Sequence, residues 1–171
     1  MKAIYQTKYG KSEVLQYGEL DSPVIKANEM RIKNYASSVN PRDWLIRSGK
    51  YQLQILVPSF PLILGSDFAG EIIEIGSKVK GFKSGDNVFG MKNPSQGLAT
   101  YSEEVVSRAN NIALIPKGIF YTQAVGVPLC SLTAWQALVE KTGIKTGMKV
   151  LIIGASGGTS FILISLVCKF L

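Results

Sequence analysis

The sequence of 171 residues contains no histidine. Histidine supplies the usual general base, the central member of Ser-His-Asp and Cys-His nucleophile systems, and a ligand in most zinc sites. Its absence excludes histidine-based chemistry and argues against a metal centre. Cysteine is nearly absent as well, with only Cys130 and Cys168, both in apolar surroundings. We expect both thiols to be reduced and buried in the core of a cytoplasmic protein.

Dense runs of charge are also missing. Lys and Arg number 19 against 12 Asp and Glu, which gives a formal net charge of +7. The surplus is scattered, and no basic tract is interleaved with aromatic residues as in a nucleic-acid-binding surface. We therefore expect no nucleic-acid partner. The basic residues are interpreted as a solvated face, although a phosphorylated cofactor would be compatible with them.

The sequence lacks a clear membrane segment. The first residues do not form the long apolar run of a signal peptide. Residues 150–171 carry few charges and are about as long as a membrane span, roughly 20 residues. Gly154, Gly157 and Gly158 divide this stretch into short apolar pieces, so we expect no membrane partner. The last piece is apolar nearly all round, which predicts a homodimer or self-association through this C-terminal tail.

Glycine, by contrast, is abundant, with 17 residues. Within residues 65–90 it recurs every few positions between apolar strand residues, a spacing that suits a tightly curved barrel. A helix is predicted to begin at Asn40-Pro41 and to end at Ser48-Gly49. Short strands are predicted over residues 1–7, 14–18, 29–35, 71–75, 88–89, within 97–106 around residues 100–102, and over 112–115.

The character of the sequence changes after residue 120. Residues 121–142 have helical spacing, which Pro128 is expected to split or kink. Residues 149–153 are predicted to form a buried strand, and an apolar helix is predicted from Thr159 onward. A glycine turn lies between them. Strand, glycine turn and helix form the first half of a βαβ unit.

The glycine turn is a candidate site for the pyrophosphate of a dinucleotide. At such a turn, backbone N–H groups and the positive end of a helix meet at one place. Gly154 would make the tight turn, and Gly157 would let the phosphates approach the backbone. A plain strand-to-helix turn without a ligand is the alternative. The predicted cofactor-binding residues of this turn are Gly154, Ala155, Ser156, Gly157, Gly158 and Thr159.

Taken together, the motifs resemble the medium-chain dehydrogenase/reductase superfamily, in its zinc-independent quinone oxidoreductase branch. The matching segments, in the family's order, are residues 38–43, 46–51, 61–70, 79–90, 97–101, 127–135 and 150–158. The resemblance implies a mainly β fold with an α/β start. A GroES-like, catalytic-type β-barrel domain would occupy residues 1–120. Residues 121–171 would form a linking helix and the truncated beginning of a Rossmann domain.

The resemblance also separates this chain from the zinc-dependent alcohol dehydrogenases. These carry a cysteine near position 40 and a histidine where this chain has Ser66, and both residues would ligate zinc. Asn40 and Ser66 cannot replace them. We therefore expect no zinc or other metal. The implied activity is NAD(P)H-dependent reduction of a small-molecule quinone or enone by direct hydride transfer, with NADPH as cofactor and NADH as the alternative.

Three further site residues follow from the resemblance. Asn40 matches an asparagine beside the nicotinamide and substrate, where its amide would donate to a carbonyl oxygen that gains negative charge. Tyr51 matches a tyrosine of the substrate pocket, and Thr133 a threonine near the nicotinamide. The alternatives are an Asn-Pro turn, an aromatic that only packs, and a helical threonine bonded to its own backbone. Asp43 and Asp67 are expected to be turn and cap carboxylates.

Two other functions stay open. In the family the polypeptide returns after the Rossmann domain to complete the catalytic domain, which these 171 residues do not do. A non-catalytic GroES-like remnant that acts by association is therefore one alternative. The enoyl-thioester reductase branch, which shares the barrel and the glycine turn, is the other.

Overall fold

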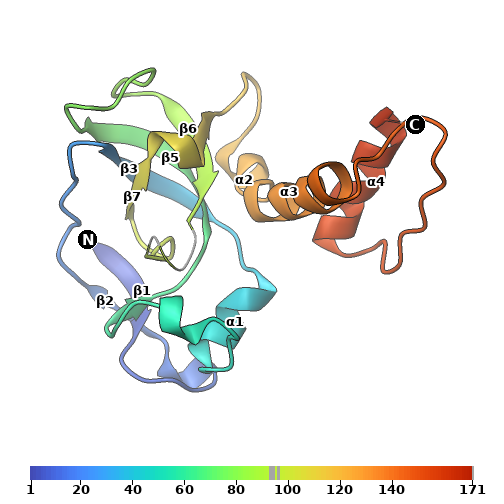
Figure 1. Cartoon of the computed structure of the whole chain (residues 1–171). Coiled ribbons are helices and arrows are strands. Elements are labelled where there is room, and N and C mark those ends of the chain that lie inside the picture. Colours follow the sequence, from blue (N-terminus) through green and yellow to red (C-terminus); the bar gives the residue numbers. More distant parts are fainter. Residues whose placement is uncertain (93–94, 96, 171) are drawn as a thin grey trace. The chain divides into compact units, whose positions relative to one another are not determined.

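The computed structural model describes residues 1–92, 95 and 97–170, and Figure 1 shows the whole chain. The chain divides into two compact units, Met1–Gly126 (unit 1) and Val127–Leu171 (unit 2). The sequence predicted a domain boundary after residue 120, and that assignment stays a prediction.

Unit 1 is built from two antiparallel sheets. The smaller sheet has the order β2-β1-β4, and the larger has the order β7-β3-β5-β6-β8 (Figure 1). The small-sheet strands are β1 (Lys2–Gln6), β2 (Gln16–Glu19) and β4 (Leu62–Ile63). The large-sheet strands are β3 (Glu29–Ser37), β5 (Asp67–Ile75), β6 (Asn87–Met91), β7 (Glu104–Arg108) and β8 (Ile112–Leu114). The mainly β fold class is confirmed.

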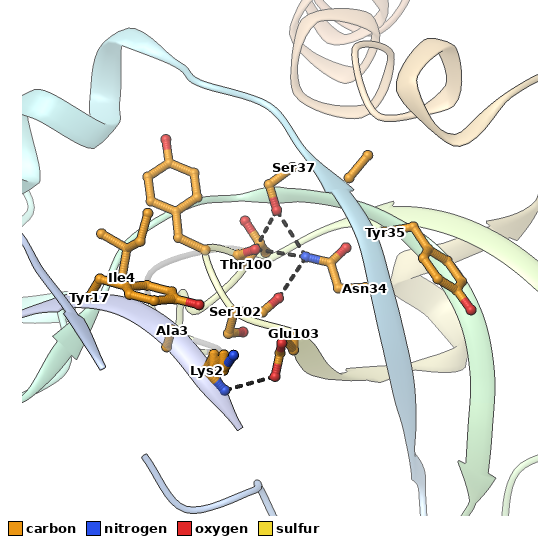
Figure 2. Close-up of a pocket in the computed structure, with 12 residues that line it drawn as sticks. Lys2, Ala3, Ile4, Tyr17, Asn34, Tyr35, Ser37, Thr100, Ser102 and Glu103 are labelled. Carbon is orange, nitrogen blue, oxygen red and sulfur yellow. Dashed lines mark hydrogen bonds between the residues drawn. The ribbon is translucent and has the colours of Figure 1, made fainter. Parts of the chain in front are cut away.

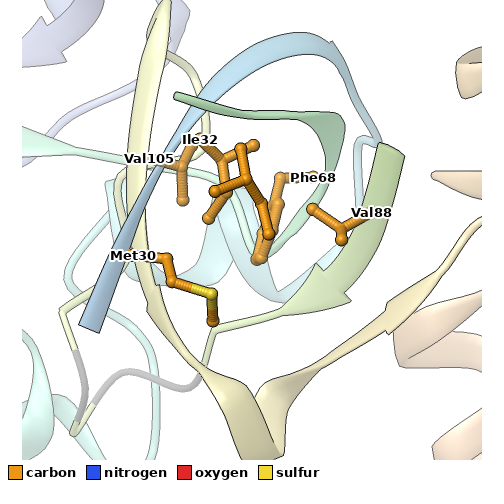
Figure 3. Packing of buried hydrophobic residues seen from close by; sticks show 6 residues of the cluster. Met30, Ile32, Phe68, Val88 and Val105 are labelled. Carbon is orange, nitrogen blue, oxygen red and sulfur yellow. The ribbon is translucent and has the colours of Figure 1, made fainter. Parts of the chain in front are cut away.

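The larger sheet curls around a closed apolar cluster. Alternate residues of its strands point inward, and Figure 3 shows the buried side chains converging from β3, β5, β6 and β7. Two register shifts between β3 and β5 mark irregularities that bend the pair. At Gly70 the two strands approach so closely that a Cβ atom would lie 2.0 Å from the carbonyl oxygen of Lys33. Only glycine fits there. The cluster consists of Met30, Ile32, Phe68, Ile72, Val88 and Val105.

The predicted helix after β3 is present. It is α1 (Pro41–Arg47), with Asn40 as N-cap and Pro41 at the first helical position. The fixed φ of proline suits that position, and its missing N–H costs nothing there. The chain leaves the helix through Ser48 and through Gly49 at φ 74°. Short 3-10 helices lie at η1 (Ser12–Val14), η2 (Gln54–Leu56) and η4 (Ala109–Asn111).

The strand predicted within residues 97–106 is present as β7, but it starts at Glu104, so the predicted centre at residues 100–102 is wrong. Ser102 forms only an isolated bridge with Ala3. The carbonyl groups of Thr100 and Ser102 instead accept hydrogen bonds from the side-chain amide of Asn34. The backbone of the segment also bonds β1, since Ile4 N–H donates to the Tyr101 carbonyl oxygen at 2.8 Å and Glu103 N–H donates to the Lys2 carbonyl oxygen at 3.0 Å, but these bonds form a single bridge and no ladder.

The helical region after residue 120 begins with α2 (Tyr121–Ala124), which belongs to unit 1. Unit 2 contains α3 (Pro128–Trp135), the π-helix η5 (Gln136–Lys141) and α4 (Gly158–Phe170). Pro128 occupies the first turn of α3, so the predicted split at this proline is confirmed.

The strand predicted over residues 149–153 is not formed. Leu151 and Ile153 are each 85% exposed, so the prediction of a buried strand is wrong. A strand is stabilised by hydrogen bonds to a neighbour, and no strand is assigned among the described residues of unit 2. The apolar composition of the segment is therefore not matched by burial.

The apolar tail is the helix α4. Phe161 on this helix is 66% exposed, and Ile164 is 38% exposed. Both cysteines are free, but Cys130 is half-buried and Cys168 is exposed, so the prediction of two buried core thiols is wrong. None of the helices that the structure describes is long and apolar enough to cross a membrane.

Candidate active site and cofactor turn

A cluster of polar side chains gathers where β3 leads into α1 and where β5 begins. Asn40 is 7% exposed and Asp67 is 2% exposed. The Asp67 Oδ2 atom accepts a short hydrogen bond from Ser38 Oγ and another from Asn40 Nδ2 at 2.8 Å. Asn40 Nδ2 also donates to Ser38 Oγ at 2.9 Å. The three side chains form a closed triangle inside unit 1.

This triangle fixes the direction of the Asn40 amide. The amide nitrogen carries two hydrogens, and both are used by Ser38 and Asp67. An ionised carboxylate only accepts hydrogen bonds, so the nitrogen and not the oxygen of the amide faces Asp67. The predicted donation from Asn40 to a substrate oxygen would therefore require one of these bonds to break. That role stays a prediction.

Asn40 and Asp43 also hold the start of α1. The Asn40 backbone N–H donates to Asp43 Oδ2 at 2.7 Å, and the Asp43 backbone N–H donates to the backbone carbonyl oxygen of Asn40 at 2.9 Å. Tyr101 OH also donates to Asp43 Oδ2, at 2.9 Å. Burial raises the pKa of Asp43, and the two hydrogen bonds to its carboxylate oppose that rise. The cap role predicted for Asp43 is confirmed, whereas Asp67 is a buried strand residue and neither turn nor cap.

Arg42 is the cation of this cluster, and sequence reasoning missed it. Its Nε donates to Ser66 Oγ at 2.7 Å, and its Nη2 donates to the carbonyl oxygen of Lys92 at 2.7 Å. Burial lowers the pKa of Arg42, while Asp43, Tyr51 and Asp67 oppose the change. The guanidinium stays charged, since its ordinary pKa is far above neutral. The only sequence signal was its place between Asn40 and Asp43.

Tyr51 lies at the edge of a second apolar cluster. Its half-buried ring packs against the buried residues Ile46, Leu62, Leu64 and Leu98. The ring therefore contributes packing, as the alternative interpretation expects. The pocket role predicted for Tyr51 stays a prediction.

A hollow in unit 1 was not predicted from the sequence. It has a volume of about 340 Å³ and lies between the two sheets (Figure 2). On its wall, Asn34 Nδ2 donates to Ser37 Oγ at 3.0 Å and to the carbonyl oxygens of Thr100 and Ser102 at 2.8 and 3.0 Å. These bonds join residues 100–103 to β3. We interpret the polar wall as structural.

In unit 2 the glycine turn and the start of α4 are formed as predicted. Gly154 has φ 75°, and a Cβ atom there would meet nothing within 4 Å. The turn is closed by the Gly157 N–H, which donates to the Gly154 carbonyl oxygen at 3.0 Å. The first N–H groups of a helix lack intrahelical acceptors and attract anions. The open backbone beside them fits a phosphate group of a dinucleotide.

Two other residues of unit 2 have structural explanations. Thr133 is exposed on α3, and its hydroxyl donates to the carbonyl oxygen of Leu129 at 2.7 Å. This is the backbone bond that the sequence alternative expects. A Cβ atom at Gly158 would lie 3.1 Å from Cys130 Sγ, so glycine permits close packing of α4 on α3. The cofactor roles predicted for the turn and for Thr133 stay predictions.

In the part of the chain that the structure describes, acidic and thiol side chains do not gather into a metal-binding group. Among the residues that the structure describes, no group of three or more His, Cys, Asp or Glu side chains could hold a metal ion. The absence of zinc itself stays a prediction.

Known proteins share this architecture. The alcohol dehydrogenase GroES-like domain matches residues 26–125. The human protein named NAD(P)H oxidoreductase RTN4IP1, mitochondrial is 41% identical over 169 residues, covering 88% of this chain and 42% of the relative. The tomato (Solanum lycopersicum) 2-methylene-furan-3-one reductase is 34% identical, covering 97% of this chain and 44% of its own length. Human quinone oxidoreductase is also 34% identical, covering 92% and 46%. The chain thus spans less than half the length of these relatives.

Solved structures give the same result. The quinone oxidoreductase from Coxiella burnetii superposes with a TM-score of 0.92 at 33% identity, covering 99% of this chain and 54% of that one. The Escherichia coli quinone oxidoreductase, complexed with NADPH, superposes with a TM-score of 0.86 at 32% identity, covering 99% and 50%. The resemblance seen in the sequence is confirmed. The chain belongs to the alcohol dehydrogenase GroES-like domain family, in the quinone oxidoreductase branch of the medium-chain dehydrogenase/reductase superfamily.

Proposed function

We propose that the chain is part of an NAD(P)H-dependent oxidoreductase that reduces a quinone or an enone without zinc. The observation that carries the proposal is the open glycine turn at the start of α4, because a bare turn before a helix fits a dinucleotide phosphate. The E. coli structure contains NADPH, and two relatives are named for a quinone and for a methylene-furanone. These names support NADPH as cofactor and a conjugated carbonyl compound as acceptor.

A bound nicotinamide cofactor would supply the hydride. The backbone N–H groups at the start of α4 would hold a phosphate of that cofactor. In unit 1, Asp67 and Ser38 would hold the Asn40 amide with its nitrogen inward. Asn40 would then meet a ligand through its amide oxygen, as an acceptor from an N–H or O–H group. This differs from the donor role that the sequence suggested.

Arg42 is the better donor to a substrate oxygen. Its guanidinium has five N–H groups, and two of them bond Ser66 and Lys92. The remaining N–H groups and the positive charge would stabilise an acceptor oxygen as it gains negative charge. The Tyr51 hydroxyl would be a second donor beside it. We also propose residues 1–120 as the catalytic-type domain and residues 121–171 as the start of the cofactor domain.

The cellular location belongs to the proposal as well. The sequence suggested a cytoplasmic protein. The human, cattle and mouse relatives carry the word mitochondrial in their names. We keep the cytoplasm as the proposed location, and fluorescence microscopy of the tagged chain tests it against mitochondria.

The test of the proposed function is a fluorescence titration of the 171-residue chain with NADPH, with NADH for comparison. Gly154→Ala is the test variant and Gly147→Ala is its control. Both glycines have positive φ, and at neither would a Cβ atom meet anything within 4 Å. We expect saturable NADPH binding that Gly154→Ala weakens and Gly147→Ala leaves unchanged. Absence of binding at millimolar NADPH would contradict the proposal for this chain.

Two alternatives predict other outcomes. A non-catalytic remnant is favoured by the exposed apolar surface of unit 2, where Ile153 is 85% exposed and Phe161 is 66% exposed. Such a surface favours self-association, including a homodimer, which light scattering measures. An enoyl-thioester reductase would bind NADPH but oxidise it only with an unsaturated thioester. Turnover assays with a quinone, an enone and an unsaturated thioester separate these functions.

A further inference from the structure

Unit 1 contains a small polar cavity that the candidate active site does not use. Its volume is about 120 Å³. It lies where β3 begins, where β6 has ended and where β7 ends. Five of its lining residues carry reactive or charged groups, namely Glu29, Lys92, Ser95, Ser107 and Arg108.

Lys92 is an unusual lysine because it is almost fully buried. It is 8% exposed. Its amino group forms no hydrogen bond or ion pair with any residue that the structure describes. Burial lowers the pKa of Lys92 to about 8, and the Glu29 carboxylate opposes this shift. Roughly a fifth of the amine is therefore neutral near pH 7.4, and a neutral amine is a nucleophile.

Ser107 lines the same cavity and is 4% exposed. Its hydroxyl has no hydrogen-bond partner among the described residues. A buried hydroxyl without a partner is costly, so a group that bonds to it gains stability. A carbonyl oxygen placed beside Lys92 would supply such a partner.

The charges of the cavity decide which product fits. The Arg108 guanidinium lies 3.8 Å from the Glu29 carboxylate, so these two groups balance each other. A protonated Lys92 then adds one uncompensated buried charge. A carbamate formed with carbon dioxide would add a negative charge beside Glu29. A neutral amide leaves the Arg108–Glu29 pair balanced and removes the buried cation.

We propose that Lys92 is a site of covalent acylation by small acyl phosphates. The lone pair of Nζ attacks the acyl carbon, and the new N–C bond forms as the bond from that carbon to the phosphate oxygen breaks. The phosphate leaves with the electron pair of that bond, and the amine proton passes to solvent. Ser107 bonds the acyl oxygen, and Arg108, whose Nε faces Glu29, offers its Nη groups to the phosphate of the donor. The inference does not rest on the proposed function.

The test uses acetyl phosphate on the intact 171-residue chain at pH 7.5. Acetylation of each lysine is measured at low occupancy by peptide mass spectrometry. A fall in pKa from 10.5 to about 8 gives roughly two hundred times more neutral amine at this pH. Because Lys92 is buried, acetyl phosphate reaches it less easily than it reaches an exposed lysine, which reduces this advantage in reaction rate. We expect Lys92 to react at least about ten times faster than the exposed Lys78, Lys80 and Lys83.

Three comparisons make the result specific. If the cavity causes the faster acetylation of Lys92, unfolding the chain in urea should make Lys92 react at the same rate as the reference lysines. Ser107→Ala slows Lys92 severalfold and leaves the three reference lysines unchanged. Acetyl-coenzyme A is too large for about 120 Å³ and shows no preference for Lys92. The proposal is overturned if Lys92 reacts no faster than the references, if urea preserves its advantage, or if the thioester and not the acyl phosphate prefers it.

Discussion

Replacement of Lys92 by methionine is expected to stabilise unit 1 at neutral pH. Methionine has a similar length and no charge, so Lys92→Met removes the buried cation without leaving a large cavity. The fall in pKa from 10.5 to about 8, at 1.36 kcal/mol per unit, corresponds to about 3 kcal/mol. Relaxation of the protein around Lys92 and entry of water into the cavity reduce this free-energy difference. We expect the variant to gain about 2 kcal/mol in the free energy of unfolding at pH 7.

The sign of the pH dependence follows from proton binding. Between pH 8 and 10.5 the unfolded chain keeps a proton on Lys92 that the folded chain has released. Because the unfolded state binds more protons there, the stability of the parent rises with pH over this window. Methionine has no such titration. The advantage of the variant should therefore be constant below pH 8 and should shrink as the pH approaches 10.5.

Urea unfolding monitored by the fluorescence of Trp44 measures this effect, since Trp44 lies in unit 1. Both proteins carry Trp135→Phe, so that unit 2 does not contribute to the signal. Lys78→Met, at an exposed lysine, is the control and should change stability by less than about 0.5 kcal/mol. The reasoning would be refuted if the Lys92→Met variant were less stable than its parent at pH 7 and if the free energy of unfolding of the two proteins changed with pH in the same way.

Three further predictions concern particular contacts. At Gly65, φ is 92° and a Cβ atom would lie 2.3 Å from Thr100 Oγ1, so Gly65→Ala should lower the free energy of unfolding of unit 1 by more than about 2 kcal/mol in urea unfolding. The control is Gly81→Ala, where φ is 82° but the space is open, and this variant should cost only about 1 kcal/mol. Tyr101→Phe removes the donor to the buried Asp43 and should cost about 2 kcal/mol at pH 7 by the same measurement; no change would mean that water replaces the hydroxyl. Phe161→Lys places a charge on the exposed side of α4 and should lower the average mass in light scattering, whereas the exposed Lys145→Glu should not.

Local sequence patterns predicted most of the fold of unit 1. The strand predicted over residues 29–35 is β3, and the apolar residues between recurring glycines within residues 65–90 marked β5 and β6. Asn40-Pro41 marked the start of α1. These signals worked because each depends on residues that are close in sequence. The comparison with known proteins then confirmed the family.

The errors came from contacts between distant residues. The segment at residues 100–102 has strand-like composition, but Asn34 takes its carbonyl groups across a separation of 66 residues. The segment at residues 149–153 also has strand composition, yet a strand needs a partner, and none of the described residues of unit 2 provides one. Composition can show that a segment is able to form a strand, but pairing decides whether it does.

The same limit applies to the candidate site. Sequence reasoning found Asn40 through its motif but missed Arg42 and Lys92. The importance of Arg42 comes from its bonds to Ser66 and to the Lys92 carbonyl, which are 24 and 50 residues away. Lys92 is singled out by burial, and no local pattern marks a lysine as buried. Both residues resemble ordinary surface charges in the sequence.

Asn40 shows how a distant contact changes the chemistry of a residue that was identified correctly. The motif establishes that an amide is present, and an amide can donate or accept. Asp67, 27 residues away, accepts from the amide nitrogen, and Ser38 accepts the second hydrogen. Because both amide hydrogens are used, the amide oxygen of Asn40 is the atom left for a ligand. The hydrogen-bond donor to the substrate oxygen that is reduced therefore has to be another residue. Arg42 has unused N–H groups and lies two residues further along the chain, which is why the proposed reaction assigns that role to the guanidinium.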